Sequence, residues 1–110
     1  MGTSDAGTTA EPEHPTTSLG GMELPEETLA DLQRRLRRIE GQVRGIQHML
    51  EVGRDCRELV TQIAAANKAL EQVGFVLVAA GLTWCLDDPE RSAAAGYELA
   101  DVQRMFLKLA

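Results

Sequence analysis

The chain has 110 residues, of which 44% are hydrophobic and 25% charged, and its formal net charge is −6 at pH 7. This length leaves room for at most one domain, and the acidic balance gives the chain as a whole no attraction for nucleic acid. The sequence contains no secretory signal and no apolar run of 18 residues. We therefore expect a cytoplasmic protein that neither crosses nor binds a membrane.

The charges are unevenly distributed along the chain. Six of the seventeen acidic residues lie at or before residue 28, where there is no Lys or Arg, and the remaining eleven acids balance eleven bases. Five of those bases fall close together, at Arg34, Arg35, Arg37, Arg38 and Arg44. A local basic patch, more than the whole-chain charge, determines whether a surface binds phosphate.

Residues 1–22 are rich in Gly, Thr, Ser and Pro and have no apolar periodicity. Such a composition buries too little surface to offset the entropy of ordering the chain. We expect a disordered acidic N-terminal tail at 1–22 and one helical domain at 23–110. The domain can build only a thin core, which favours oligomerisation.

Two long helices are predicted at residues 25–52 and 56–86. Apolar residues recur at alternating steps of three and four, which is helical spacing. They are Leu29, Leu32, Leu36, Ile39, Val43, Ile46 and Leu50, then Leu59, Ile63, Ala66, Leu70, Val73, Leu77 and Ala80. Gly53 marks the first helix end, and Asp55 with Glu58 resembles a capping box for the second helix.

A third helix is predicted from the motif that follows. Asp88 suits an N-cap and Pro89 suits the first helical position. Gly96 is a possible break, and an amphipathic segment runs from Leu99 to the C-terminus. The predicted fold class is all-α, with a three-helix protomer.

The two cysteines, Cys56 and Cys85, stand at opposite ends of the predicted second helix. At about 1.5 Å per residue, a continuous helix separates them by roughly 43 Å, far beyond the ~4.4–6.8 Å between Cα atoms in a disulfide. They can meet only between two chains whose second helices pack antiparallel. The alternative interpretation is that both are small buried hydrophobic residues.

The surroundings of the two thiols differ. Cys56 lies in the first helical turn beside Arg54 and Arg57, which favours the reactive thiolate, although Asp55 and Glu58 oppose this. Cys85 lies at the negative end of the helix, before two aspartates. We expect Cys56 to be the attacking thiol and Cys85 the resolving one.

The stretch "RLRRIEGQVRGIQHMLEVGRDCRELVTQIAAANKALEQVGFVLVAAGLTWCL" closely resembles the copper-sensitive operon repressor (CsoR/RcnR) family. The resemblance spans residues 32–86. It implies an antiparallel helical dimer that assembles into a disc-like tetramer, a dimer of dimers without a helix-turn-helix. It also implies a transcriptional repressor that binds double-stranded operator DNA, with no enzymatic activity and no cofactor.

The sequence departs from the metal-sensing members of that family. Copper sensors carry a histidine four residues before the second cysteine, where this chain has Gly81, and nickel and cobalt sensors add one near Leu24. His14 and His48 are expected to be surface residues. We expect no metal site, the alternative being a Cu(I) site made by Cys56 and Cys85 alone.

A two-cysteine site without histidine resembles the persulfide-sensing branch, the CsoR-like sulfurtransferase repressors, as does "VGFVLVAAGLTWC". The resemblance implies that low-molecular-weight persulfides or polysulfides modify Cys56. Cys85 of a second chain then forms a di-, tri- or tetrasulfide link, and DNA is released. A thiol-redox enzyme or a sulfur carrier is less consistent, since there is no CxxC motif, and a purely structural helical module leaves the arginines unexplained.

The expected DNA-binding residues are Arg34, Arg35, Arg37, Arg38 and Arg44 on the first helix and Lys68 on the second. The family resemblance implies that an arginine at the Arg35 position contacts DNA. A later basic position of the family corresponds to Gln72 here, which carries no charge.

Overall fold

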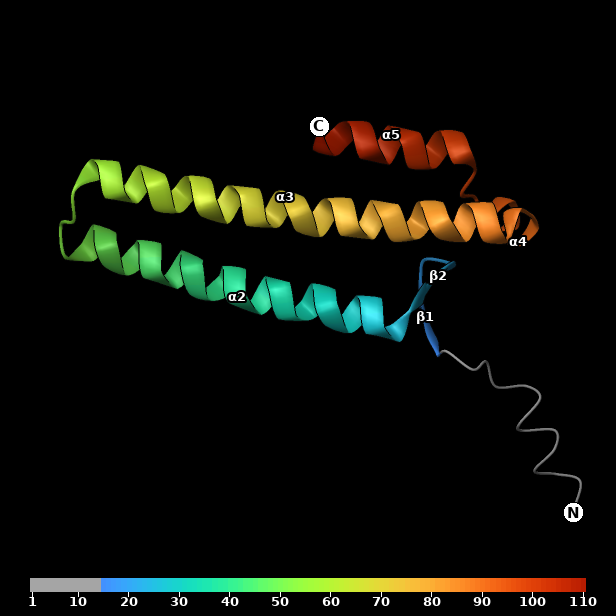
Figure 1. Cartoon of the computed structure of the whole chain (residues 1–110), viewed down its shortest axis with the longest axis horizontal. Coiled ribbons are helices and arrows are strands. Elements are labelled where there is room, and N and C mark those ends of the chain that lie inside the picture. The colour runs from blue at the N-terminus through green and yellow to red at the C-terminus, as the bar shows by residue number, and fades with distance from the viewer. Residues whose placement is uncertain (1–14) are drawn as a thin grey trace, which may run out of the picture.

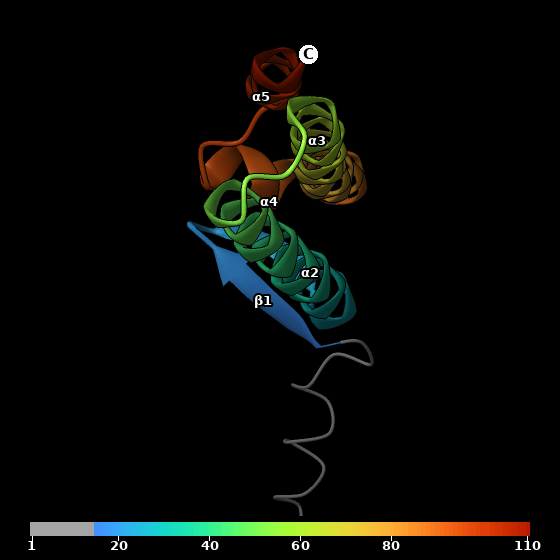
Figure 2. The same cartoon turned by 90° about the vertical axis from the view of Figure 1, so that its left-hand side faces the viewer.

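The computed structural model describes residues 15–110, which form one small hairpin and four helices. In chain order these are β1 (Thr16–Leu19), β2 (Met22–Pro25), α2 (Glu26–Glu51), α3 (Cys56–Asp87), α4 (Pro89–Ala94) and α5 (Leu99–Leu109). α2 and α3 run antiparallel side by side, and α5 turns back along the C-terminal half of α3 (Figure 1). α3 lies between α2 and α5 when the molecule is seen from its end (Figure 2).

α2 and α3 match the two long helices predicted from the sequence to within one residue at each end. The core between them is formed by Leu32, Ile39 and Val73, with Ala69, Val76 and Leu77 packed around it. The other half of the α2 seam does not reach this core. Leu36, Val43 and Leu50, spaced seven residues apart, are 44%, 46% and 64% exposed.

α2 ends within one residue of the position predicted from the sequence and α3 begins at the predicted residue, but the predicted side-chain capping of α3 does not form. Gly53 takes a left-handed backbone conformation, with φ of +71°, just after α2, as a helix C-terminus commonly requires. Asp55 is the N-cap residue of α3, but its side chain makes no capping bond. Glu58 instead pairs with Arg54, with 2.6 Å between Glu58 Oε1 and Arg54 Nη2, so the predicted capping box does not form.

The predicted third helix is two helices. Asp88 caps α4 by accepting a bond from the Arg91 backbone N–H, and Pro89 is the first helical residue, as expected. Gly96, with φ of +89°, lies in the turn between α4 and α5. A left-handed residue cannot continue a right-handed helix, so the chain reverses there and α5 packs back on α3.

Residues 16–22 are ordered, which corrects the prediction of a disordered segment at 1–22 and of an all-α fold; residues 1–14 lie outside the described part. β1 and β2 pair antiparallel, from Thr16 opposite Pro25 to Leu19 opposite Met22. Gly20 and Gly21 both have positive φ, as tight two-residue hairpin turns require. The alternating residues Met22 and Leu24 are 6% and 0% exposed against the helices, which anchors the hairpin.

The described protomer is a thin rod with much apolar surface in solvent. Its radius of gyration is 19.3 Å, whereas a compact domain of 100 residues has about 13 Å. By length and composition, α3 would be able to cross a membrane, with a mean hydropathy of 1.6 over its most apolar window. Its exposed apolar residues include Val60, Ile63 and Leu70. Exposed apolar surface of this extent indicates a surface that binds a partner.

We predict that Leu24→Ala destabilises the fold by about 2–5 kcal/mol, because a fully buried leucine leaves a cavity in the contact between the hairpin and the helices. Urea unfolding followed by circular dichroism measures this change. Leu86→Ala is the matched control, since Leu86 is 63% exposed. An equal effect of both changes would show that the hairpin contributes nothing to stability.

Candidate thiol site and nucleic-acid interface

Cys56 is the first residue of α3 and its side chain is exposed. The turn after α2 brings two guanidinium groups to the same end of the rod, those of Arg54 and Arg57. Arg54 is bound by Glu58, whereas Arg57 makes no ion pair within residues 15–110. Cys56 is therefore an accessible thiol at the N-terminal end of a long helix with one unpaired arginine beside it.

Cys85 is buried, with 6% of its surface exposed, near the other end of α3. Its Sγ lies 3.7 Å from the Tyr97 carbonyl oxygen, to which the thiol donates a weak hydrogen bond. The Ser92 hydroxyl donates to the same carbonyl, and the Tyr97 ring packs edge-on against Trp84 with centroids 6.3 Å apart. The turn between α4 and α5 thus covers this thiol.

The two cysteines lie on the same face of α3. They are separated by twenty-nine residues, which is about eight full turns of an α-helix, so their side chains leave the helix in nearly the same direction. Between them this face carries Ile63 and Leu70, which are 52% and 50% exposed. This face is therefore open and apolar over the half that follows Cys56, whereas toward Cys85 it is covered by Leu109 of α5 at Gly74 and by Met22 of the hairpin at Gly81.

Gly81 lies one helical turn before Cys85 and is covered by Met22 of β2. A Cβ atom on Gly81 would lie 2.9 Å from Met22 Cε and 3.0 Å from Met22 Sδ, closer than the ~3.5–4.0 Å at which carbon atoms pack. The absence of a side chain at position 81 thus admits the thioether. Leu24, the other expected ligand position of metal-sensing relatives, is fully buried in β2.

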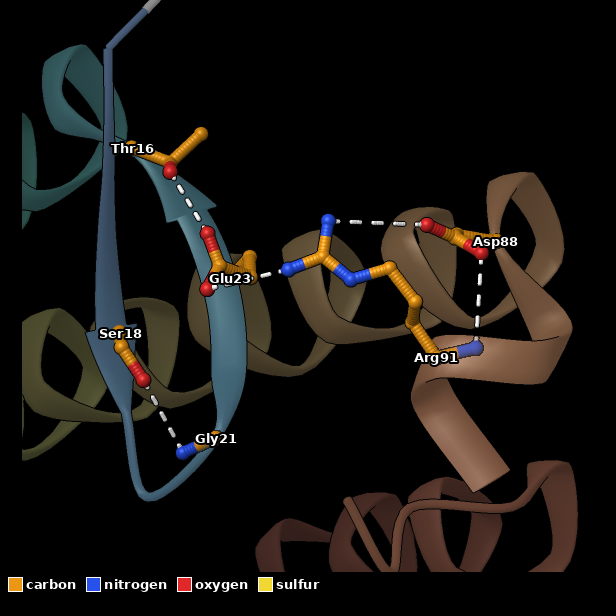
Figure 3. Close-up of polar contacts among 6 residues, drawn as sticks. All are labelled: Thr16, Ser18, Gly21, Glu23, Asp88 and Arg91. Carbon is orange, nitrogen blue, oxygen red and sulfur yellow. Dashed lines mark hydrogen bonds and ion pairs between the residues drawn. The ribbon is translucent and has the colours of Figure 1, made fainter. Parts of the chain in front are cut away.

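Polar contacts hold the hairpin against the end of α3 and α4 (Figure 3). Glu23 accepts a hydrogen bond from the Thr16 hydroxyl at 2.7 Å and pairs with Arg91 at 3.5 Å. Arg91 also reaches Asp88 at 3.9 Å. Exposed ion pairs contribute little stability, about 0–1 kcal/mol each, so these contacts orient the hairpin while Met22 and Leu24 anchor it.

The arginines of α2 form two groups. Arg34 and Arg35 both pair with Asp31, at 3.6 and 2.9 Å, and Arg44 approaches Glu40 at 4.0 Å. Arg37 and Arg38 are exposed and make no ion pair within the described chain. A phosphate can therefore bind the second group directly but must compete with a carboxylate at the first.

A groove of about 310 Å³ between α2 and α3 brings basic and amide side chains together. It is lined by Arg35, Arg38, Ile39, Gln42, Ala69 and Gln72. Lys68 is exposed and lies one turn before Gln72 on α3. Both helices thus contribute donors to one edge of the rod, and Gln72 provides an amide where the family resemblance implies a base. His48 is exposed near the C-terminal end of α2, as expected.

This arrangement of helices, arginines and thiols is that of a transcriptional repressor family. The family model described as "metal-sensitive transcriptional repressor" matches residues 28–108, and the chain therefore belongs to that family, whose members are repressors and not enzymes. The chain is 42% identical over 77 residues to the copper-sensing transcriptional repressor CsoR of Bacillus subtilis, a match covering 67% of this chain and 76% of that protein.

Further relatives and solved structures agree with this membership. The chain is 43% identical over 68 residues to the copper-sensing transcriptional repressor RicR of Mycobacterium tuberculosis, covering 62% of this chain and 68% of that protein. A crystal structure of the copper-sensing repressor CsoR with Cu(I) from Geobacillus thermodenitrificans matches with TM-score 0.67 and 31% identity, over 88% of this chain and 97% of that chain. The nickel-responsive transcriptional regulator InrS matches with TM-score 0.62 and 28% identity, over 90% and 100%.

The described residues of one chain do not fit a metal ion. Within residues 15–110 no three His, Cys, Asp or Glu side chains come together as a ligand group. The thiols of Cys56 and Cys85 are at opposite ends of α3, and Gly81 offers no donor while Met22 fills the space beside it. Any metal bound by both thiols would need two chains and would lack a third ligand from position 81.

Met22, Ser92 and Tyr97 belong to the site but were missed by sequence reasoning. A glycine inside a helix next to a cysteine is a signal that another group approaches the backbone there. The signal does not say which group approaches. Tyr97 and Met22 reach Cys85 and Gly81 through the folding back of α5 and of the hairpin, which no local pattern specifies.

We predict that the two thiols react at different rates with a thiol-specific disulfide reagent. Cys85→Ser, which keeps the exposed Cys56, should react rapidly. Cys56→Ser should react at least about tenfold more slowly, because Cys85 must first be uncovered by local opening. Both rates are measured by the absorbance of the chromophoric thiolate that the reagent releases, and the two variants should react at equal rates in denaturant. Equal rates in native protein would contradict the burial of Cys85.

Proposed function

We propose that the protein is a transcriptional repressor that binds operator DNA and is released when a low-molecular-weight persulfide or polysulfide links Cys56 to Cys85 of a second chain. The observation that carries this proposal is the position of both thiols on one apolar face of α3, too far apart to meet within a chain. The absence of a donor at Gly81 favours sulfur chemistry over a three-ligand metal site.

A two-fold antiparallel dimer explains the open apolar surface. Leu70 lies midway between the two cysteines and is half exposed. When two α3 helices cross antiparallel at this point, each Cys56 approaches the Cys85 of the other chain, which gives two equivalent sites. The exposed α2 column of Leu36, Val43 and Leu50 supplies further apolar surface for the same contact.

A second apolar surface is available for assembly into a tetramer. A groove of about 650 Å³ runs between α3 and α5 and is almost entirely apolar. Its lining residues include Phe75, Leu82, Phe106 and Leu107, of which the last is 68% exposed. The cysteine-bearing face and this groove together give each protomer two distinct contacts, the number that a dimer of dimers needs.

The proposed chemistry is thiol exchange in two balanced steps. The Cys56 thiolate attacks the terminal sulfur of R–S–SH, forming Cys56–S–SH and expelling R–S⁻. The Cys85 thiolate of the second chain, having lost its proton to solvent, then attacks the Cys56 sulfur, forming the disulfide and expelling HS⁻. When both thiols carry a persulfide, the same attack gives a trisulfide and HS⁻.

The cover over Cys85 connects this reaction to the fold. The Tyr97 carbonyl accepts bonds from both the Cys85 thiol and the Ser92 hydroxyl. Bond formation at Cys85 removes one of these donors and requires space now occupied by the turn between α4 and α5. The cross-link therefore displaces the turn that positions α5, and a change in α5 packing alters how protomers assemble on DNA.

We predict that treatment with a low-molecular-weight persulfide converts the protein into covalent dimers, detected by mass spectrometry without reductant. Neither Cys56→Ser nor Cys85→Ser, treated by itself, should form a dimer linked from Cys56 to Cys85, because each variant lacks one of the two thiols. Reassembled mixtures of the two variants should regain one such link, because a mixed dimer retains one complete pair. Links within one chain, or none after persulfide treatment, would refute the proposed site.

Cu(I) is the second candidate inducer, because the relatives named above include two copper-sensing repressors and a solved structure with Cu(I). Two thiolates can hold Cu(I) in a linear fashion. Operator release should be compared for persulfide, peroxide, Cu(I) and Ni(II) under anaerobic conditions. We expect release by persulfide; release by Cu(I) alone, with no covalent dimer, would establish copper sensing instead.

The DNA contact is proposed for the arginine-bearing edge, comprising Arg34, Arg35, Arg37, Arg38, Arg44 and Lys68. We predict that Arg35→Ala weakens operator binding. The slope of log K against log salt concentration should become shallower by about one for each phosphate contact that is lost. Fluorescence anisotropy over a salt series measures both. Arg104→Ala is the matched control on α5, since Arg104 pairs with Asp101 away from this edge. An unchanged slope would exclude Arg35 from the interface.

A further inference from the structure

Among residues 15–110, only Met22 comes within 4 Å of the Cβ position of Gly81, apart from the backbone of α3 and the chain neighbours of Gly81. The contact comes from a different element. The thioether reaches α3 from β2, the inner strand of the hairpin. Met22 and Cys85 are both buried, each with 6% of its surface exposed. Residues 81 and 85 are one helical turn apart and share a face of α3.

We propose that Met22 is a specificity-determining residue of the thiol site, because its side chain fills from the hairpin the space that a third ligand at position 81 would occupy. The proposal rests on the proposed site between Cys56 and Cys85 of two chains. It accounts for how the space beside position 81, which carries no donor in this member of a metal-sensitive family, is filled. The site is left with two thiols, which suits sulfur transfer.

The contact distances leave no room for a side chain at position 81 while the flexible Met22 thioether keeps its present position. A residue 81 with any side chain would place its Cβ 2.9 Å from Met22 Cε, and something must move to relieve that overlap. The nearest free space is a small cavity of about 140 Å³ bordered by Met22, Leu77 and Met105, among others. An imidazole at position 81 therefore requires Met22 to leave its place or to be removed.

The test is a double-mutant cycle on Cu(I) affinity, measured anaerobically by competition with a chromophoric Cu(I) chelator. Gly81→His is introduced into the wild-type chain and into Met22→Ala. We expect the gain in Cu(I) affinity to be at least tenfold larger in the Met22→Ala background, where the imidazole has room. X-ray absorption should then show a nitrogen ligand in the double variant only.

A matched control separates the Met22 contact from a general loosening of the core. Met105 of α5 borders the same small cavity but does not cover Gly81. In Met105→Ala, the gain from Gly81→His should equal that in the wild-type background. An equal gain in all three backgrounds would overturn the proposal. The proposal would also be overturned if X-ray absorption of Cu(I) bound to the wild-type protein showed a sulfur ligand that is lost in Met22→Leu, because Met22 would then be a ligand.

A stability comparison tests the contact without any partner chain or metal. Gly45 in α2 has no described residue within 4 Å of its Cβ position, so Gly45→Ala should raise the thermal midpoint, since alanine favours a helix more than glycine. Gly81→Ala should give no rise or a fall, and in Met22→Ala it should give a rise. A rise from Gly81→Ala in the wild-type chain overturns the proposal.

The outcomes distinguish this proposal from the proposed function. Persulfide cross-linking of the wild-type chain decides whether Cys56 and Cys85 form a site between chains. If cross-linking occurs and Gly81→His gains no affinity in either background, the role of Met22 is refuted. If no cross-link forms, the proposed function fails, and the comparison of Gly45→Ala with Gly81→Ala decides whether Met22 closes position 81.

Discussion

The constraint on which the rest depends is the length of a single stiff helix. α3 spans Cys56–Asp87 without interruption, and so holds its two thiols about 43 Å apart. A rod of this kind cannot close on itself to form a dithiol site. Every chemical role for the pair therefore needs a second chain, and the apolar residues exposed on the Cys56 half of α3 are where we propose that this chain binds. On our proposal, assembly and sensing use the same surface.

The two ends of the rod are unequal because different parts of the chain cover them. The end with Cys56 is a bare turn after α2, whereas the end with Cys85 carries the hairpin, α4 and the start of α5. Cys56 is exposed, so a reagent reaches it without movement of any other element of the same chain. Cys85 is buried beside the Tyr97 turn, so a reaction there requires that turn or the hairpin to move. On our proposal, a response that needs both thiols is therefore coupled to the packing of α5.

Local patterns predicted what is local in this structure. The seam from Leu29 to Leu50, the break at Gly53 and the Asp88–Pro89 start all lie where the sequence indicated, because periodicity and punctuation act over a few residues. The hairpin was missed because only Met22 and Leu24 anchor it, and their burial depends on helices that come later in the chain. The cover over Cys85 was missed for the same reason, since Tyr97 and Met22 reach it by tertiary packing.

Gly81 shows how an absent side chain can carry structural information. In the sequence, Gly81 stands where copper-sensing members of the family carry a histidine ligand. In the structure, it is the position against which Met22 packs. Met22 of β2 fills that position, and Cys85, one helical turn further along α3, is 6% exposed, so a reagent reaches this thiol only after a covering element moves. Two thiolates of the soft type can take either sulfane sulfur or Cu(I). On our proposal, the closed third position favours the first, because exchange between sulfur atoms needs two thiols in line and no further donor.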